Sequence, residues 1–312
     1  MNKLKKLFDK YIGGNIAKPD YIEEMHNMHS SLFEYSDFIK NKDISKIEIT
    51  DDSVIMTSRN TAVKIICDSA DYRIAPIEIL NFTYYEKEDS GMMDELLELM
   101  SPEGAVIFDI GANIGWYSIN FSKKLKQVDI YAFEPVPTTH DYLVTNCVMN
   151  GVKNVIREKK GLSDIEDELD IYYYPEGSGN SSLKNLTEDS NVQKFTADIT
   201  TLDNYMDKNK IKSLDFIKCD VEGAELLVFK GGEKSIIKYK PIIFTEMLRK
   251  WSAKFDYHPN EIIEFFAGLG YECFVTKQGK LRKFFEMDDG TIETNFFFMH
   301  TVKHKKEIES LV

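Results

Sequence analysis

One ten-residue stretch limits the possible folds of this chain more than any other. Residues 106–115 are Val-Ile-Phe-Asp-Ile-Gly-Ala-Asn-Ile-Gly, an apolar run that leads through an acid into a glycine-containing turn. The apolar run is typical of a strand buried on both faces of a parallel sheet. Gly111 and Gly115 remove side chains where a ligand or the next helix must approach the backbone, and Asn113 tolerates a left-handed conformation. The stretch therefore predicts the first strand and turn of a βαβ unit, with a ligand site at the turn.

Apolar and amphipathic segments alternate through the rest of the chain. We expect strands at residues 105–110, 128–133, 154–159, 213–219, 241–246, 271–275 and 295–300, and helices at 114–124, 137–149, 223–238 and 259–268. A polar stretch interrupts this order with two further strands, at 168–174 and 193–199, and a Gly/Ser-rich loop at 177–182. The alternation predicts a doubly wound α/β fold.

The N-terminal residues have a different pattern. Residues 1–12 form a short basic amphipathic helix, residues 20–41 look helical, and three short alternating segments follow between 46 and 67. We predict an N-terminal α+β accessory or cap region at 1–75 and a main domain at 76–312. The first helix is expected to pack on its own domain or on a dimer partner, with weak adhesion to an anionic membrane surface as the alternative.

The glycine turn and a downstream acid indicate a nucleoside-bearing cofactor. Glu134 ends the second strand about twenty residues beyond the turn, where a βαβ unit places its ribose-binding acid. The spacing departs from the nicotinamide motif G-x-G-x-x-G, because Asn113 stands where a glycine belongs. An acid at Asp109 suits a cofactor with a positive end, such as S-adenosylmethionine (SAM), better than one with two phosphates.

Four ordered motifs resemble those of the FkbM-type SAM-dependent methyltransferases. They are Asp-Ile-Gly-Ala-Asn-Ile-Gly at 109–115, Tyr-Ala-Phe-Glu-Pro at 131–135, Thr-Leu-Asp at 201–203 and Lys-Cys-Asp-Val-Glu-Gly-Ala-Glu at 218–225. The resemblance covers roughly residues 80–300. It implies a Rossmann-like class I methyltransferase sheet of seven strands that ends in an antiparallel hairpin. It also implies methylation of hydroxyl oxygens on sugars, polyketides or other secondary metabolites.

The expected cofactor contacts follow from the strand ends. Either Asp109 or the backbone amides of the turn would orient the methionine ammonium of SAM, and Glu134 would accept both ribose hydroxyls. The resemblance places the adenine edge near Ser163 and Asp164, for which an ordinary polar turn is the alternative. The full set of predicted cofactor-binding residues is Asp109, Gly111, Ala112, Asn113, Gly115, Glu134, Ser163, Asp164 and Asp220.

Methyl transfer to a hydroxyl needs a base that takes the hydroxyl proton. Asp220, Glu246 and His258 are the candidates, since each follows or ends a predicted strand. Lys218 joins them as a catalytic candidate, because an extended segment places it on the same side as Asp220 and Glu222. The alternatives are a surface Lys–Asp pair with Glu222 at a helix N-terminus, and a helix-capping role for His258.

The same acids offer a metal alternative. Asp220, Glu222 and Glu246 could hold Mg²⁺, which would lower the pKa of a chelating diol. Their spacing is not diagnostic, and we expect no metal.

Composition narrows the partners and the compartment. The formal net charge of −13 argues against a nucleic-acid substrate. The apolar runs are too short to span a bilayer and the N-terminus lacks a signal-peptide pattern, so we expect a cytoplasmic protein. Four widely separated cysteines indicate neither disulfides nor zinc.

The sequence thus predicts a SAM-dependent O-methyltransferase. Its acceptor would be a small polyhydroxylated molecule, a sugar or a nucleotide-linked sugar. A nicotinamide-dependent oxidoreductase and a non-catalytic SAM-binding scaffold remain as alternatives. The oligomeric state stays open.

Overall fold

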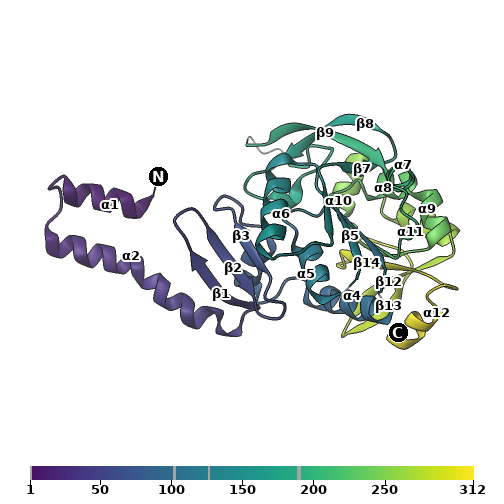
Figure 1. The fold of residues 1–312 in the computed structure, drawn as a ribbon, viewed down its shortest axis with the longest axis horizontal. Coiled ribbons are helices and arrows are strands. Elements are labelled where there is room, and N and C mark those ends of the chain that lie inside the picture. The colour runs from purple at the N-terminus through teal and green to yellow at the C-terminus, as the bar shows by residue number, and fades with distance from the viewer. Residues whose placement is uncertain (1, 101–102, 126, 188–190) are drawn as a thin grey trace.

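The computed structural model describes residues 2–100, 103–125, 127–187 and 191–312. The described residues form a body around a large sheet, two three-stranded sheets and an N-terminal pair of helices that extends away from the body (Figure 1).

The large sheet has the order β13-β12-β14-β11-β10-β4-β5-β6. β4, β5, β6, β10 and β11 run parallel, whereas β14 is antiparallel to both of its neighbours. The strands are β4 (Val106–Ile110), β5 (Asp129–Phe133), β6 (Val155–Glu158), β10 (Phe216–Cys219), β11 (Ile242–Glu246), β12 (Tyr271–Lys277), β13 (Lys280–Phe284) and β14 (Asn295–His300). The strand order reverses between β4 and β10, so the carboxyl ends of these two strands form the topological switch point.

The predicted doubly wound α/β class is confirmed, and two details are corrected. Within the described residues the sheet has eight strands rather than seven, because β13 adds to the edge beside β12. The helix expected at 223–238 is two helices, α8 (Glu225–Gly231) and α9 (Glu233–Tyr239), which meet at Gly232. A Cβ on Gly231 would lie 2.0 Å from the Ser163 carbonyl oxygen, so only glycine lets α8 pass this close to its neighbour.

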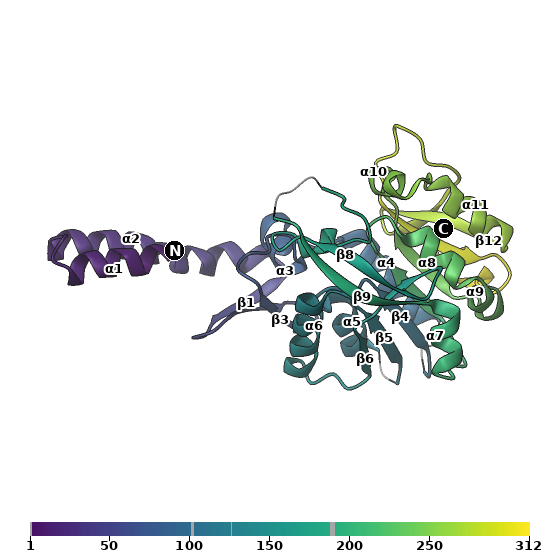
Figure 2. The same cartoon turned by 90° about the horizontal axis from the view of Figure 1, so that it is seen from above.

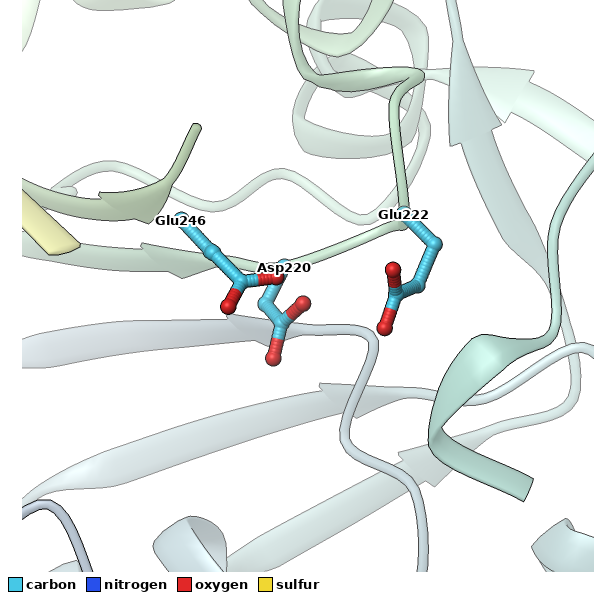
Figure 3. A group of neighbouring side chains, drawn as sticks. All are labelled: Asp220, Glu222 and Glu246. Atoms are coloured by element: carbon cyan, nitrogen blue, oxygen red, sulfur yellow. The ribbon is translucent and has the colours of Figure 1, made fainter. Parts of the chain in front are cut away.

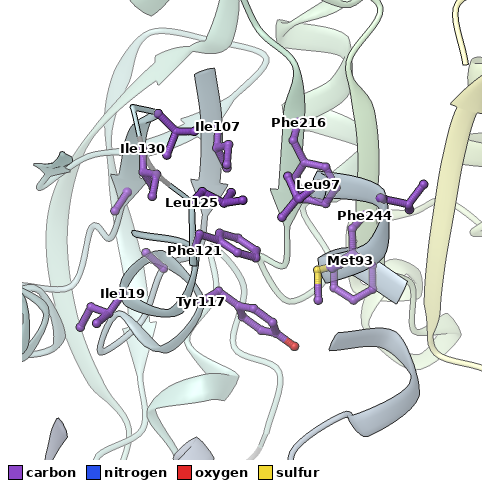
Figure 4. Close-up of a cluster of buried hydrophobic side chains, with 14 of the residues drawn as sticks. Met93, Leu97, Ile107, Tyr117, Ile119, Phe121, Leu125, Ile130, Phe216 and Phe244 are labelled. Atoms are coloured by element: carbon purple, nitrogen blue, oxygen red, sulfur yellow. The ribbon is translucent and has the colours of Figure 1, made fainter. Parts of the chain in front are cut away.

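Helices cover both faces of the large sheet. One face packs against α4 (Lys87–Leu99), α5 (Trp116–Lys124), α6 (Pro137–Met149) and α12 (Lys305–Leu311). The opposite face packs against α7 (Leu202–Lys208), α8, α9 and α11 (Asn260–Gly268). Figure 4 shows the first face, where Phe121 of α5 lies against Phe216 of β10 with ring centroids 6.1 Å apart. Alternate side chains of each strand thus enter opposite cores, which rigidly fixes the strand ends.

A second sheet, β7-β9-β8, lies over the edge of the body. It comprises β7 (Gly161–Ser163), β8 (Asp167–Tyr173) and β9 (Gln193–Thr201). The loop after β8 contains the short helix η2 (Ser178–Asn180), which returns toward the turn that follows β4.

The N-terminal region begins with the helices α1 (Lys3–Ile12) and α2 (Lys18–Phe38), which lie side by side in Figure 1 and project from the molecule in Figure 2. The short helix η1 (Ile39–Asn41) leads into the third sheet, which comprises β1 (Ile44–Ile49), β2 (Val54–Ser58) and β3 (Lys64–Cys67). Helices α3 (Ala75–Phe82) and α4 then enter the body, and α10 (Arg249–Ser252) and η3 (Ala253–Phe255) follow β11. None of the helices that the structure describes is long and apolar enough to cross a membrane.

Two asparagines of the body hold the free edge of β3. Asn146 Oδ1 accepts the Ile66 amide at 2.9 Å, and Asn150 Oδ1 accepts the Lys64 amide at 2.9 Å. The Asn146 amide also donates to the Ile114 carbonyl at 3.0 Å, in the turn that follows β4. These side chains satisfy edge groups that would otherwise lack partners and join the small sheet to the body. The boundary predicted at residue 75 remains a prediction.

Candidate active site

A cavity of about 490 Å³ opens at the carboxyl ends of β4, β5, β10 and β11. Its volume is within the usual range for a small-molecule site. The walls come from the turn after β4, from Glu134, from residues 178–183 and from the segment 218–224. Residues 73–86, which enclose α3, close the remaining side. The cavity therefore lies at the switch point of the sheet, where open α/β sheets bind their ligands.

The glycine turn approaches its neighbours closely. Gly111 has a φ of +77°, and a Cβ built there would lie 1.8 Å from the Asp220 carbonyl oxygen. Gly115 has a φ of +91°, and its Cβ would lie 2.6 Å from Leu143 Cδ1. Asn113 also has a positive φ, of +49°. Gly111, Ala112 and Asn113 line the cavity, whereas Gly115 supports the turn by its contact with α6.

Glu134 sits at the floor of the cavity with both carboxylate oxygens engaged. Its Oε2 accepts the Asn113 amide at 3.0 Å, and its Oε1 accepts the Val136 amide at 2.9 Å. Burial raises the pKa of Glu134 to about 7, against the lowering effect of the two backbone amides. Each oxygen keeps a further lone pair, so the carboxylate can still accept hydrogen bonds from a ligand.

Lys218 links the glycine turn to the acids of the cavity. Its Nζ donates to the Gly111 carbonyl at 2.9 Å and lies 3.2 Å from Asp220 Oδ2 and 3.7 Å from Asp109 Oδ1. Burial alone lowers the pKa of Lys218, but the charges of Asp220 and Asp109 outweigh this effect and raise it. Lys218 is thus a buried cation held between two carboxylates.

Asp109 lies behind the cavity wall. It is fully buried, accepts a hydrogen bond from Ser118 Oγ at 2.5 Å, and is not among the residues that line the cavity. Burial raises its pKa and Lys218 opposes this effect. The structure therefore places Asp109 beside Lys218 and outside the cavity wall, whereas Gly111, Ala112 and Asn113 line the cavity. The amides of Gly111 and Ala112 both donate to the Phe133 carbonyl.

Three carboxylates converge at the opposite wall. Asp220, Glu222 and Glu246 each have an oxygen within 4.8 Å of the other two, and their side chains point toward one another in Figure 3. Burial, reinforced by the charge of Asp220, raises the pKa values of Glu222 and Glu246. Glu222 has a φ of +53°, which is unusual for a side chain of this kind. Glu222 and Glu246 consequently retain protons more readily than free glutamates.

The structure adds a fourth acid that the sequence analysis missed. Glu86 lines the cavity, accepts a hydrogen bond from the Tyr117 hydroxyl through Oε2, and accepts one from Asn295 Nδ2 at 3.1 Å through Oε1. Burial raises the pKa of Glu86. Glu86 precedes α4 and follows no strand, so strand-end patterns could not identify it. Tyr117, by contrast, could have been recognised from the sequence as a site residue, because it is the second residue of the helix that follows the glycine turn.

Three further predicted site residues, besides Asp109 and Gly115, lie outside the cavity. Ser163 is buried beside Gly231 and Asp164 is exposed, while Leu162, their neighbour in the chain, lines the cavity instead. His258 is exposed, and its Nδ1 accepts the Asn260 amide at 3.2 Å, where it caps α11. The structure thus favours the helix-capping alternative for His258, and none of these three residues lines the cavity.

A loop from the second sheet closes over the glycine turn. Ser178 Oγ lies 3.1 Å from Asn113 Nδ2, and the Ser178 amide donates to Asp71 Oδ2 at 3.1 Å. Ser182 Oγ donates to the Glu222 carbonyl at 2.8 Å. The predicted Gly/Ser-rich loop therefore forms the lid side of the cavity and connects the N-terminal region with the acidic wall.

Glu225 fixes the turn that carries Asp220 and Glu222. Its Oε1 accepts the Val221 and Gly223 amides, both at 3.1 Å, and the Tyr257 hydroxyl donates to its Oε2 at 3.3 Å. Glu225 is 2% exposed, and burial raises its pKa from 4.5 to about 7 despite the backbone hydrogen bonds. The folded state therefore binds this proton more tightly than the unfolded state.

Glu225→Gln should weaken the pH dependence of stability. The raised pKa gives the wild type stability that is complete below pH 4.5 and is lost as the pH rises through about 7. We expect the free energy of unfolding of the wild type to fall by about 3 kcal/mol more than that of the variant over this range. Urea unfolding at pH 5 and pH 8 measures the difference. Exposed Glu168→Gln is the control, and equal pH slopes for wild type and Glu225→Gln would contradict the assignment.

The comparisons with known proteins now identify the chain. The family model described as the methyltransferase FkbM domain matches residues 109–273, more than half of the 312 residues. The chain belongs to the FkbM methyltransferase family. The match begins at Asp109 and extends through the glycine turn, Glu134 and the segment with Lys218 and Asp220, which confirms the resemblance predicted from these motifs.

Similar proteins include methyltransferases from a fungus and an archaeon. The methyltransferase sdnD of Sordaria araneosa is 34% identical over 158 residues, which cover 42% of this chain and 61% of that protein. The hexuronic acid methyltransferase AglP of Haloferax volcanii is 32% identical over 129 residues, 41% of this chain and 50% of that protein. The chain thus spans 50–61% of the length of these two curated relatives. A solved FkbM methyltransferase from Methylobacillus flagellatus aligns with a TM-score of 0.40 and 16% identity over 62% of this chain and 43% of that one.

Proposed function

We propose that this chain is a SAM-dependent O-methyltransferase that acts on a small polyhydroxylated acceptor, a sugar or a nucleotide-linked sugar. One observation carries the proposal: a single cavity combines the glycine turn and Glu134 on one side with the carboxylates of Asp220 and Glu246 on the other. The part of the cavity that would hold the cofactor is therefore continuous with the part that would accept the proton; we call them the cofactor half and the acceptor half. The FkbM family supports methyl transfer, and the similarity to a hexuronic acid methyltransferase supports a sugar acceptor.

The residues of the cofactor half fit SAM. Gly111 lets the turn pass close to the Asp220 carbonyl, which any side chain would block, and Ala112 and Asn113 line the cavity beside it. Glu134 would accept the ribose hydroxyls through its remaining lone pairs, and Leu162 would face the adenine. SAM, when bound, supplies a methyl group on a positively charged sulfur. The acids of the cavity suit that positive charge.

The acceptor half supplies the base. Asp220 faces the Lys218 ammonium at 3.2 Å, whereas burial raises the pKa values of Glu222 and Glu246. When neighbouring carboxyl groups have such different environments, one can accept a proton while the other holds one. We assign proton acceptance from the acceptor hydroxyl to Asp220, with Glu246 as the second candidate. With Asp220 as the base, Glu246 would orient the acceptor hydroxyl by hydrogen bonding.

Glu134→Ala should weaken binding of S-adenosylhomocysteine (SAH) about 100-fold, because it removes the charged acceptor for two hydroxyls. Calorimetric titration of wild type and variant with SAH measures the change. Asp164→Ala is the control, since Asp164 is exposed outside the cavity, and it should bind SAH as the wild type does. If SAH binds neither to the wild type nor to the Asp164 variant while NAD does, the oxidoreductase alternative replaces this proposal.

Asp220→Asn should lower kcat for an identified acceptor by about 100-fold or more, the usual contribution of a general base. His258→Ala should leave kcat unchanged, because His258 is exposed and caps α11. Turnover is measured with labelled SAM across a panel of sugars, with SAH affinity as the check on folding. A full wild-type rate in Asp220→Asn would remove the base assignment. No turnover on any acceptor, with SAH still bound, would favour the scaffold alternative.

The Mg²⁺ alternative uses Asp220, Glu222 and Glu246 as ligands. Their oxygens are close enough for a shared ion, and hard oxygen ligands suit it. The nearby Lys218 already supplies positive charge to Asp220, so we propose a reaction without a metal. Turnover that stops with a chelator and returns with Mg²⁺ would reverse this choice.

A further inference from the structure

The helices α1 and α2 form a hairpin that stands away from the rest of the molecule (Figures 1 and 2). None of the 21 residues of α2 is buried, and only Leu7 is buried in α1. The large apolar side chains that both helices expose are Leu4, Phe8, Ile12, Ile22, Met28, Leu32, Phe33, Tyr35 and Phe38. So many exposed apolar side chains on one short hairpin indicate an interaction site.

The apolar residues of α2 follow the spacing of a coiled coil. Steps of four and three residues alternate, and place one apolar residue on the same face at each step. The series is Tyr21, Met25, Met28, Leu32 and Tyr35, and the same spacing reaches Ile39 at the start of η1. We call this face the α2 seam. Its regular period predicts that another helix packs along its whole length.

Helix α1 covers only the first half of the α2 seam. Tyr11 stacks on Tyr21 with ring centroids 4.3 Å apart, which places the end of α1 against the start of α2. At 1.5 Å per residue, the ten residues of α1 extend about 15 Å, whereas the 21 residues of α2 extend about 32 Å. Leu32 and Tyr35 in the second half are accordingly 52% and 43% exposed. Among the described residues, no helix covers them.

We infer that the second half of the α2 seam binds the same surface of a second copy of this chain, with the two α2 helices antiparallel. Leu32 would lie near the two-fold axis and meet its equivalent, as an isologous contact requires. The two α1 helices would flank the pair, to give a four-helix bundle outside both bodies. The inference is independent of the proposed methyl transfer.

Charge favours a second copy as the occupant. Helix α1 carries four lysines and one aspartate, whereas α2 beyond Lys18 carries five acids and neither lysine nor arginine. In Figure 1 the start of α1 lies beside the middle of α2. In the antiparallel pair, Lys3, Lys5 and Lys6 of one copy would therefore face the second half of α2 in the other, where Glu34 lies. An anionic membrane would attract α1 but repel the acids of α2.

Sedimentation velocity of the full chain over a range of concentrations tests the inference. We expect a wild-type dimer, and Leu32→Glu should raise its dissociation constant at least about tenfold, because the charge would be buried at the contact. Leu32 is exposed in the single chain, so the variant should stay folded, with the same circular dichroism spectrum as the wild type. Asn27→Glu adds the same charge at an exposed position on the other side of α2 and should leave the dimer unchanged.

Cross-linking tests the antiparallel arrangement. Mild oxidation should convert Leu32→Cys, but not the wild type, to a disulfide-linked dimer, because a disulfide needs Cα atoms within about 7 Å. A monomer at all concentrations, a dimer that Leu32→Glu leaves intact, or failure of Leu32→Cys to cross-link a confirmed dimer would each overturn the proposal. Binding to phosphatidylserine vesicles by a chain that stays monomeric in solution would assign the face to a lipid surface instead. That outcome would also overturn the proposal.

Discussion

Gly111→Ala should abolish SAH binding and lower the free energy of unfolding by about 3–5 kcal/mol, near the upper limit for single substitutions. The added Cβ would lie 1.8 Å from the Asp220 carbonyl oxygen, so β4 and β10 could not keep their present separation at the switch point. The same displacement would move Lys218, which donates to the Gly111 carbonyl. Urea unfolding and calorimetric titration with SAH measure the two effects.

A second glycine separates the steric effect from the conformational one. Gly104 has a φ of +79°, close to that of Gly111, but a Cβ there would meet nothing within 4 Å. Gly104→Ala should therefore lose only about 1 kcal/mol and keep full SAH affinity. If the two variants lose the same stability, the close approach of the strands at Gly111 is not what requires glycine.

Lys218→Met should lower the free energy of unfolding by about 3–5 kcal/mol at neutral pH, because it leaves buried Asp109 without its cation. The Ser118 hydroxyl and the Ser118 backbone amide would remain as partners of the Asp109 carboxylate, and neither carries a charge. Protonation would relieve this isolated charge, so the loss should be smaller at pH 5 than at pH 8. Urea unfolding at both pH values measures it.

The control removes a lysine of the same kind from the surface. Lys194 pairs with Asp170, and both side chains are 50% exposed. Lys194→Met should change stability little at either pH, since water screens exposed ion pairs. A small effect of Lys218→Met that matches this control would mean that Asp109 is protonated in the wild type and that Lys218 does not stabilise it.

The sequence predicted the parts of the fold that depend on local pattern. Apolar runs and glycine positions correctly identified β4, the turn and Glu134, since a strand buried on both faces has an unmistakable composition. β13 was missed, because residues 280–284 carry three basic side chains and look like a polar loop. The break at Gly232 was also missed, because the apolar residues keep a helical spacing across it. The close approach of Gly231 to Ser163 is a tertiary contact, which this spacing does not reveal.

The residues of the candidate site, like the elements of the fold, were predicted only where a local sequence pattern marks them. Strand ends placed Lys218, Asp220 and Glu246 correctly in the cavity, because parallel strands bring their carboxyl ends to one edge. Glu86 arrives from a segment far from these strands in the sequence, so its position depends on tertiary packing alone. His258 does not line the cavity, because its loop follows β11 in the sequence but turns outward to begin α11.

The side chain of Asn146 has a consequence for a pair of joined active sites. It bonds at once to the edge of β3 and to the Ile114 carbonyl, so the small sheet cannot swing relative to the glycine turn without breaking both bonds. The hairpin extends from that sheet, away from the large sheet and its helices (Figure 1). Two chains joined through their hairpins would thus each keep a complete cavity of their own, built from one chain alone. Each would complete its catalytic cycle independently of the other, with hyperbolic rather than sigmoidal dependence on acceptor concentration.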